Sequence, residues 1–450
     1  MNQYERMTKE PIRKLTMQLA IPSILSMVIT NVYSMADTWF VSRLGTQATA
    51  AVGISFAILE LINAMGYLFG TGGGTRIGLL LGAKDRQGAS IIGSTACFFA
   101  ALLSILFGGA GLIWLPDLMR LLGSTPTIQP YAETYGRYML LGFPFLCLSL
   151  VLSTFLRGEG KNRLSMIGMA CGGVLNIALD PLFIFGLHLG ITGAAMATFI
   201  SQAVSLGFLL SFFLSGHTET KLSVSSIRPT GKLFAELFHA GLPSMCRHGA
   251  GTLSSACMNL SAGLFGGDSL IAALSIVSKA AALILAIIKG LFQGAQSVYS
   301  YNKGAGREDR IRQAYRYTLH LNLLLVTGIA ALVYFLAPAI LTMFNATDEA
   351  TISLGVSALR LHVLGLVFMP FGFSMNILLQ AVGQSWKSTF LASLPQAICY
   401  IPLVFLLPCL LGVPGLLIAP MAAYLLTDLI TIPYYRQYFS QNSKEEGILN

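Results

Sequence analysis

The chain has 450 residues, of which 54% are hydrophobic and only 10% are charged, and its formal net charge is +9. A soluble domain carries roughly 25% charged residues to cover its surface. The composition therefore excludes an ordinary soluble protein and predicts one whose main outer solvent is lipid. The seven cysteines lie in apolar stretches without metal-type spacing, so we expect them to be packing residues rather than disulfide partners or metal ligands.

Twelve apolar stretches follow one another along the chain, each long enough to cross about 30 Å of hydrocarbon as a helix. The first is too long for a cleaved signal, so we expect it to remain as a span. The long polar connection 216–233 predicts a linker between a six-helix lobe over 1–215 and a second over 234–450. The predicted spans are 15–41, 50–73, 88–115, 131–156, 164–186, 190–215, 234–262, 269–298, 313–341, 352–380, 388–411 and 414–437.

Positive charges alternate between successive loops. With the N-terminus in the cytoplasm, the inner segments carry most of the Lys and Arg residues, Arg157 and Arg310 among them. The outer segments carry only Arg43, Arg120 and Arg137. This distribution follows the positive-inside rule and predicts a multi-pass protein of the cell inner (plasma) membrane with both termini cytoplasmic. It also explains the basic net charge without nucleic acid, which we do not expect as a partner.

The two halves of the chain repeat each other. Pro22 corresponds to Pro243 at an offset of 221, and Gly82 corresponds to Gly304 at an offset of 222. Because each half has an even number of spans, both halves insert in the same orientation, related by a pseudo-two-fold axis along the membrane normal. The predicted fold is an all-α membrane protein of twelve transmembrane helices in two six-helix bundles, with a cleft that opens alternately to either side.

Acidic side chains inside the predicted spans are the first candidates for function, because charge is costly in a membrane. Asp37 lies in the first span and Asp180 in the fifth, and Asn176 precedes Asp180 by one helical turn on the same face. Burial disfavours the charged carboxylate, so these groups can load and release a proton. The alternative is that they only hydrogen-bond neighbouring helices and fix their packing.

Further candidates for substrate binding or coupling are Glu60, Lys279 and Asp428, and Met35 and Met258 could line an adaptable substrate site. Each has a structural alternative: the carboxylates could serve as packing contacts, Lys279 could snorkel, and the methionines could face lipid.

Enzyme motifs such as HExxH, GxSxG and a Walker A loop do not occur in the sequence. We therefore expect a transporter that is not an enzyme, uses no cofactor and does not hydrolyse ATP.

Several segments resemble the multidrug and toxic compound extrusion (MATE) transporters, and the resemblance covers nearly the whole chain. It implies a V-shaped pair of six-helix bundles that exports organic cations and other amphipathic compounds against H⁺ or Na⁺. The segments that carry it are Ala20-Ile21-Pro22, Asp37-Thr38-Trp39-Phe40-Val41-Ser42-Arg43-Leu44-Gly45, Asn176-Ile177-Ala178-Leu179-Asp180-Pro181, Gly190-Ile191-Thr192-Gly193-Ala194-Ala195 and, in the second half, Gly294-Ala295-Gln296-Ser297.

The resemblance also implies roles for individual residues. Asp37, Asn176, Asp180 and Thr198 match the ion-site positions of the DinF-like branch of the family, and Pro22 matches the proline at which the first span bends.

Both H⁺ and Na⁺ remain open as coupling ions, because the oxygens of Asp37, Asn176 and Asp180 also suit a hard cation. The second half has Cys399 and Leu403 at the positions of Asn176 and Asp180. This difference favours a single ion site in the first half.

Two other functions remain as alternatives. A lipid-linked precursor flippase of the same superfamily would need a cavity lined by cations such as Arg247, Lys279 and Lys289. A membrane receptor or an intramembrane enzyme is disfavoured by the short loops and the missing motifs. As an exporter, the chain would take amphipathic or cationic small molecules, sit in membrane lipid and need no obligate protein partner.

Overall fold

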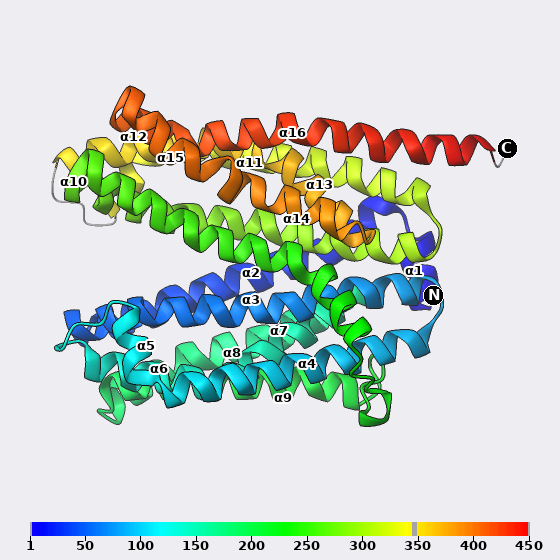
Figure 1. The fold of residues 1–450 in the computed structure, drawn as a ribbon, viewed down its shortest axis with the longest axis horizontal. Helices are drawn as coiled ribbons and strands as arrows, with labels where there is room; N and C mark the ends of the chain where they lie inside the picture. Colours follow the sequence, from blue (N-terminus) through cyan, green and yellow to red (C-terminus); the bar gives the residue numbers. More distant parts are fainter. Residues whose placement is uncertain (1, 344–348, 449–450) are drawn as a thin grey trace.

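The computed structural model describes residues 2–343 and 349–448, and that part of the chain is almost entirely helical, without β-strands (Figure 1). Sixteen α-helices follow one another, with three short 3₁₀ or π turns between them. The helices are α1 Gln3–Lys9, α2 Ile12–Ser42, α3 Thr46–Gly82, α4 Arg86–Ile113, α5 Leu115–Leu121, α6 Gln129–Leu141, α7 Phe143–Gly158, α8 Asn162–Pro181, α9 Gly190–Leu214, α10 Gly231–Gly304, α11 Glu308–Met343, α12 Glu349–Leu366, α13 Met369–Ala381, α14 Ser385–Ser393, α15 Tyr400–Leu411 and α16 Val413–Ile448; the turns are η1 Leu182–Gly186, η2 Val224–Ser226 and η3 Leu394–Ile398.

The twelve predicted spans all fall on these helices. Within the described residues, nine stretches are long and apolar enough to cross a membrane on their own. Two more spans are bent pairs, α6 with α7 at 46° and α12 with α13 at 47°. The twelfth is the first part of α10, whose 74 residues are interrupted at Gly267, where φ is 66°. Only glycine adopts that conformation easily, so α10 is two spans joined end to end.

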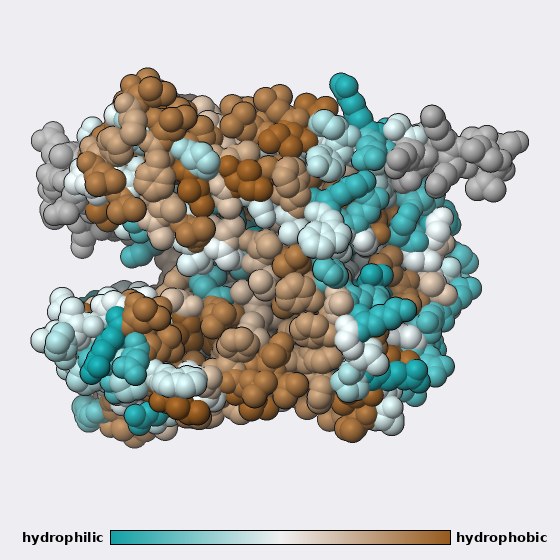
Figure 2. Space-filling model, viewed as in Figure 1, coloured by the Kyte–Doolittle hydropathy of each residue, from teal (hydrophilic) through white to brown (hydrophobic). Residues whose placement is uncertain are grey.

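The helices form two lobes with a cleft between them. Figure 1 shows α4–α9 in the lower lobe and α11–α16 in the upper one, with α2 and α3 facing α10 along the middle. Figure 2 shows that the cleft is open at the left, while the opposite end is closed and rich in hydrophilic side chains. Both α1 and the end of α16 lie at the closed end. The structure thus confirms the expected fold, an all-α membrane protein of two lobes.

The internal repeat appears in space as two reciprocal contacts at the closed end. Gly82 of α3 lies against the backbone of Tyr301 in α10, and Gly304 of α10 lies against the backbone of Leu79 in α3. The offset of 222 that relates Gly82 to Gly304 also relates Leu79 to Tyr301. A Cβ on either glycine would overlap the opposite carbonyl oxygen. The two lobes therefore meet backbone to backbone, as small residues allow in membrane proteins.

The short helix α1 covers the closed end and contacts both lobes. The Gln3 side chain donates to the carbonyl of Glu159 at 2.7 Å, in the first lobe. In the second lobe, Asn302 donates to the carbonyl of Met7 at 3.1 Å, and Arg310 donates to that of Glu10 at 2.7 Å. Arg310, expected as a loop charge, is only 7% exposed. The closed end is therefore held by specific polar contacts as well as by packing.

Candidate functional site: an acidic cavity and a basic cavity

A cavity inside the first lobe, which we call the acidic cavity, is lined by three of the four residues expected to form the ion site, and the fourth, Asp180, contacts one of them. Asp37 from α2, Asn176 from α8 and Thr198 from α9 line it among mainly apolar side chains. Asn176 donates to Asp180 at 3.3 Å and to the Thr198 hydroxyl at 3.4 Å. Asp37 accepts from the hydroxyl of Tyr135 at 3.4 Å. The one-turn spacing of Asn176 and Asp180 thus places both groups on the face that looks toward Asp37.

The local backbone at the end of α8 helps to shape this cavity. Directly after Pro181 the chain makes the π turn η1, and such turns often occur at functional sites. Gly193 of α9 lies against the backbone of Phe183 in this turn, so a side chain at Gly193 would push α9 away. Tyr135 was missed by sequence reasoning, since a single tyrosine in an apolar helix carries no distinctive pattern.

Three oxygens of this cluster are buried and accept no hydrogen bond from any described residue: Asp37 Oδ1, Asn176 Oδ1 and Asp180 Oδ2. Buried acceptors in proteins nearly always have a donor. The two carboxyl groups are also near enough to interact through their charges. A proton or a hard cation would satisfy these oxygens and reduce the repulsion. Within the described residues no group of three or more His, Cys, Asp or Glu side chains could hold a metal ion.

Pro22 lies inside α2 at the crossing of α2 with the second part of α10. Gly290 and Gly294 of α10 approach the backbone of α2 at Ile24 and Ala20, one on each side of the proline. A proline removes one helical hydrogen bond and weakens the helix where it stands.

Asn162 of α8, which sequence reasoning missed, holds α2 next to Pro22. Its side chain donates to the carbonyl of Leu19 and to the hydroxyl of Ser23, both at 2.9 Å.

The remaining predicted candidates lie outside the acidic cavity. Glu60 contacts Asn63 at 3.2 Å and His248 of the other lobe at 3.9 Å. Asp428 accepts from the backbone N–H of Gly372 at 3.0 Å and lines a small pocket in the second lobe.

Three other candidates line no pocket described here. Lys279 is exposed on α10. Met35 is 41% exposed, and Met258 is partly buried against the core. None of the three lines the acidic cavity or the second cavity, which is described next.

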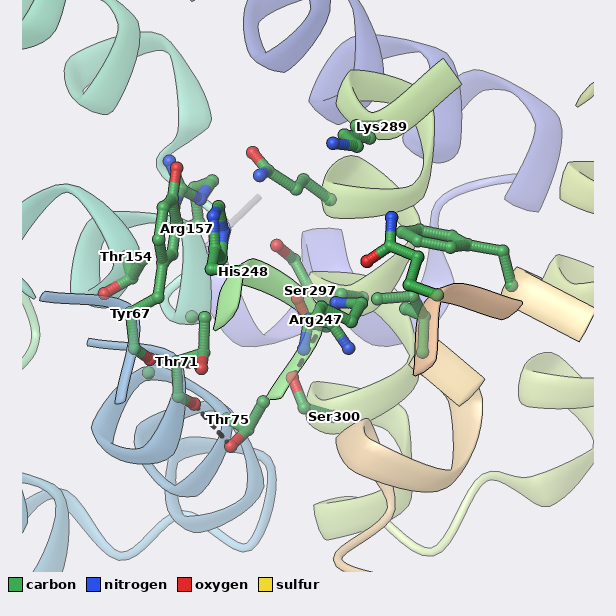
Figure 3. A pocket seen from close by; sticks show the side chains of 17 residues that line it. Tyr67, Thr71, Thr75, Thr154, Arg157, Arg247, His248, Lys289, Ser297 and Ser300 are labelled. Carbon is green, nitrogen blue, oxygen red and sulfur yellow. Dashed lines mark hydrogen bonds between the residues drawn. The ribbon is translucent and has the colours of Figure 1, made fainter. Parts of the chain in front are cut away.

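A second cavity lies where the two lobes meet (Figure 3). Its charged lining residues are cations: Arg157 from α7, and Arg247 and Lys289 from the two parts of α10. Figure 3 shows the labelled side chains converging on it from α3, α7 and α10. We call it the central cavity.

Arg157 was expected among the cytoplasmic loop charges, and that expectation is wrong. Its side chain lies in the last turn of α7, is only 9% exposed and donates to Ser153 at 3.0 Å. Its position near the end of a predicted span made it look like a loop residue. The side chain points into the central cavity because α7 packs against α3, and that packing cannot be read from the sequence.

Comparisons with known proteins agree with this architecture. The MatE family model matches residues 22–182 and 243–406. The multidrug export protein MepA of Staphylococcus saprophyticus is 27% identical over 437 residues, covering 94% of this chain and 96% of MepA. MepA of Staphylococcus aureus strain MRSA252 is 26% identical over 439 residues, with the same coverage.

Solved structures give the same result at the level of the fold. A MATE protein in complex with MaL6 has a TM-score of 0.93 and 25% identity, over 99% of this chain and 100% of that one. An outward-facing multidrug resistance MATE family transporter of the MOP superfamily also has a TM-score of 0.93 and 25% identity, over 99% of both chains. Because the family model spans well over half of its residues, this chain belongs to the MatE family.

Proposed function

We propose that this chain is a secondary active multidrug exporter that exchanges amphipathic or cationic organic compounds for H⁺, or for Na⁺, by alternating access. Its membership of the MatE family and its MepA relatives support multidrug efflux by a transporter that is not an enzyme. The observation that carries the ion coupling is the set of buried oxygens without donors on Asp37, Asn176 and Asp180. We assign the chain to the DinF-like branch on the same residues.

The coupling ion binds in the acidic cavity. Protonation of Asp37 and Asp180 supplies donors where the cluster has only acceptors, and it removes the repulsion between two carboxylates. A Na⁺ ion would achieve the same with the oxygens of Asn176 and Thr198 as additional ligands. In either case the ion stabilises one packing of α2 against α8, and loss of the ion favours another. An ion shifts such an equilibrium only by its differential affinity for the two states.

Pro22 transmits this change to the other lobe. Asp37 lies fifteen residues beyond it on the same helix, roughly 22 Å away at 1.5 Å per residue. Ala20 and Ile24, which flank the proline, contact Gly294 and Gly290 of α10. A bend of α2 at Pro22 therefore moves the contact between the lobes, although the ion site lies within one lobe.

The moving bodies are residues 1–215 and 234–450, joined by the linker 216–233. With both termini in the cytoplasm, the open cleft of Figure 2 faces outward. The contacts of α1 and the crossing of Gly82 with Gly304 then close the cytoplasmic side.

The test is efflux of a fluorescent lipophilic cation from proteoliposomes under an imposed pH gradient and, separately, an imposed Na⁺ gradient. We expect the pH gradient to drive efflux in the wild type, Asp37→Asn to abolish it, and Asp117→Asn to retain it. Asp117 is a matched control because it lies on α5, exposed and outside both cavities. Efflux under the Na⁺ gradient alone would assign Na⁺ to the acidic cavity. No cation movement under either gradient would overturn the proposal.

A further inference from the structure

The central cavity has a charge that an exporter of cations does not need. Arg157, Arg247 and Lys289 line it, and among the described residues no Asp or Glu does so. Arg157 is buried and Arg247 and Lys289 are half-buried, and cations removed from water without counter-charges are unfavourable. A bound anionic ligand would supply the missing opposite charge.

The two arginines are held in place by neutral partners. Arg247 donates to Asn376 at 2.6 Å, to Ser244 at 2.6 Å and to Gln380 at 3.2 Å. Arg157 donates to the hydroxyl of Ser153. These contacts orient the guanidinium groups but leave their charges uncompensated. The sites are therefore pre-organised for an anion, since guanidinium groups bind carboxylate and phosphate oxygens in fixed geometry.

Glu60 of α3 contacts His248, which lines the cavity, but it does not neutralise these cations. His248 stacks on Tyr67 with ring centroids 4.4 Å apart. Glu60 is near enough to act on the charge of Lys289. Even so, one carboxylate faces three cations, and within the described residues none of the three has a carboxylate within 4.0 Å.

The cavity also holds polar atoms that lack hydrogen-bond partners. A mainly apolar pocket lies next to it. Gln293 Oε1, Gln296 Nε2 and Gln396 Oε1 are buried without hydrogen bonds to any described residue. This smaller pocket shares Arg247, Phe373 and Gln396 with the central cavity. Its other lining residues are mainly apolar, but Asp428 also lines it and accepts from the N–H of Gly372. The cations, the unpaired glutamine groups and the mainly apolar pocket therefore lie next to one another.

We propose that the central cavity binds the anionic group, a phosphate or carboxylate, of an amphiphilic substrate, with Arg157, Arg247 and Lys289 as its ligands and the adjoining pocket as the site of its apolar part. The inference rests on the proposed export by alternating access, because it names what the interface between the lobes binds. It widens the substrate class from cations to anionic and zwitterionic amphiphiles. The source is either a soluble aromatic anion or a lipid-linked phosphate.

The test is equilibrium binding to the purified full chain in a non-ionic detergent, followed by isothermal titration calorimetry. The probes are 1-naphthyl phosphate, farnesyl phosphate, inorganic phosphate and 1-naphthylmethylamine. We expect the two organic phosphates to bind and the amine and inorganic phosphate to bind at least tenfold more weakly. Tighter binding of naphthyl phosphate would assign a soluble substrate, and tighter binding of farnesyl phosphate a lipid-linked one.

Two lysines of α10 provide matched variants. Lys289→Gln removes a cation of the cavity and should weaken binding of 1-naphthyl phosphate by about tenfold or more. Lys279→Gln removes the same charge from an exposed position ten residues away and should leave binding unchanged. Arg157→Gln should act like Lys289→Gln, provided that thermal unfolding shows the variant to be folded.

Three results would overturn the inference: equal binding of the amine, inorganic phosphate binding as tightly as the organic phosphates, or equal effects of the two lysine variants. The measurement needs no gradient. Failure of ion-coupled cation efflux would therefore leave the binding result intact, and failure of binding would leave the efflux result intact.

Discussion

The acidic cavity and the central cavity differ in how they are built. The acidic cavity takes its polar groups from α2, α6, α8 and α9, all within one lobe, so its geometry can survive a movement of the lobes. The central cavity takes its lining from α3 and α7 of one lobe and from α10 and α13 of the other. Any rocking of the lobes must therefore change the central cavity. Under the proposed exchange, the ion site would keep its geometry while the substrate site changes between the two states.

The two cavities are connected through a single helix crossing. α2 carries Asp37 toward one end and contacts Gly290 and Gly294 of α10 around Pro22. Lys289 and Gln293, the neighbours of these glycines in sequence, line the central cavity. A change in the packing of α2 thus reaches the central cavity through direct contacts, without a separate pathway.

The largest expected effect is a difference in efflux between variants of Asp180 in the first lobe and Asp428 in the second. Asp180→Asn should reduce gradient-driven efflux by about a hundredfold or more, because the cluster loses one of its two titrating groups. Asp428→Asn should stay within about threefold, since an amide oxygen can still accept from the N–H of Gly372. Efflux from proteoliposomes measures both. An equal loss in the two variants would place coupling in both lobes and contradict a single ion site.

A second prediction concerns the crossing between the two cavities. Gly294→Val should block transport and destabilise the protein by about 1–3 kcal/mol, because a Cβ there would lie 2.5 Å from Cα of Ala20. Thermal unfolding and efflux test this together. The matched control is Gly328→Val on α11, where a Cβ meets no atom within 4 Å. Normal transport by Gly294→Val would show that the crossing does not carry the coupling.

The smallest expected effect distinguishes H⁺ from Na⁺ as the coupling ion. Thr198→Val removes a hydroxyl that accepts a long hydrogen bond, 3.4 Å, from Asn176. Under H⁺ coupling the loss of efflux should be about fivefold at most, as for one weak neutral hydrogen bond. Under Na⁺ coupling the hydroxyl would be an ion ligand, and the apparent affinity for Na⁺ should fall more steeply. The Na⁺ dependence of efflux in Thr198→Val decides between the two.

Much of the fold could be predicted from the sequence, because hydropathy and loop charge respond directly to the membrane. All twelve predicted spans fall on helices, including the first part of α10, which is not among the nine stretches of the described residues that pass as spans by length and composition. The cluster of Asp37, Asn176, Asp180 and Thr198 was also predicted, from the helical spacing of two residues and the family resemblance for the rest. Three of them line one cavity and Asp180 hydrogen-bonds to Asn176 there, which supports that prediction, while their roles await the tests above.

Predictions about single side chains near span ends were less reliable. Arg157 and Arg310 both looked like cytoplasmic loop charges, and both are buried. Lys279 and Lys289 looked alike, yet one is exposed and the other lines the central cavity. Hydropathy reports how apolar a segment is, but it does not report which face of a helix meets another helix.

By itself, the sequence determined the helical spans and the two-fold repeat, because the spans follow from the transfer of residues between water and lipid and the repeat from an offset along the chain. Only the tertiary structure decided that three cations from α7 and the two parts of α10 share one cavity, while Asp37, Asn176 and Thr198 share another. Such groupings depend on how helices far apart in sequence cross and rotate against each other. The glycines at those crossings are visible in the sequence, but which backbone each one meets is settled only by packing.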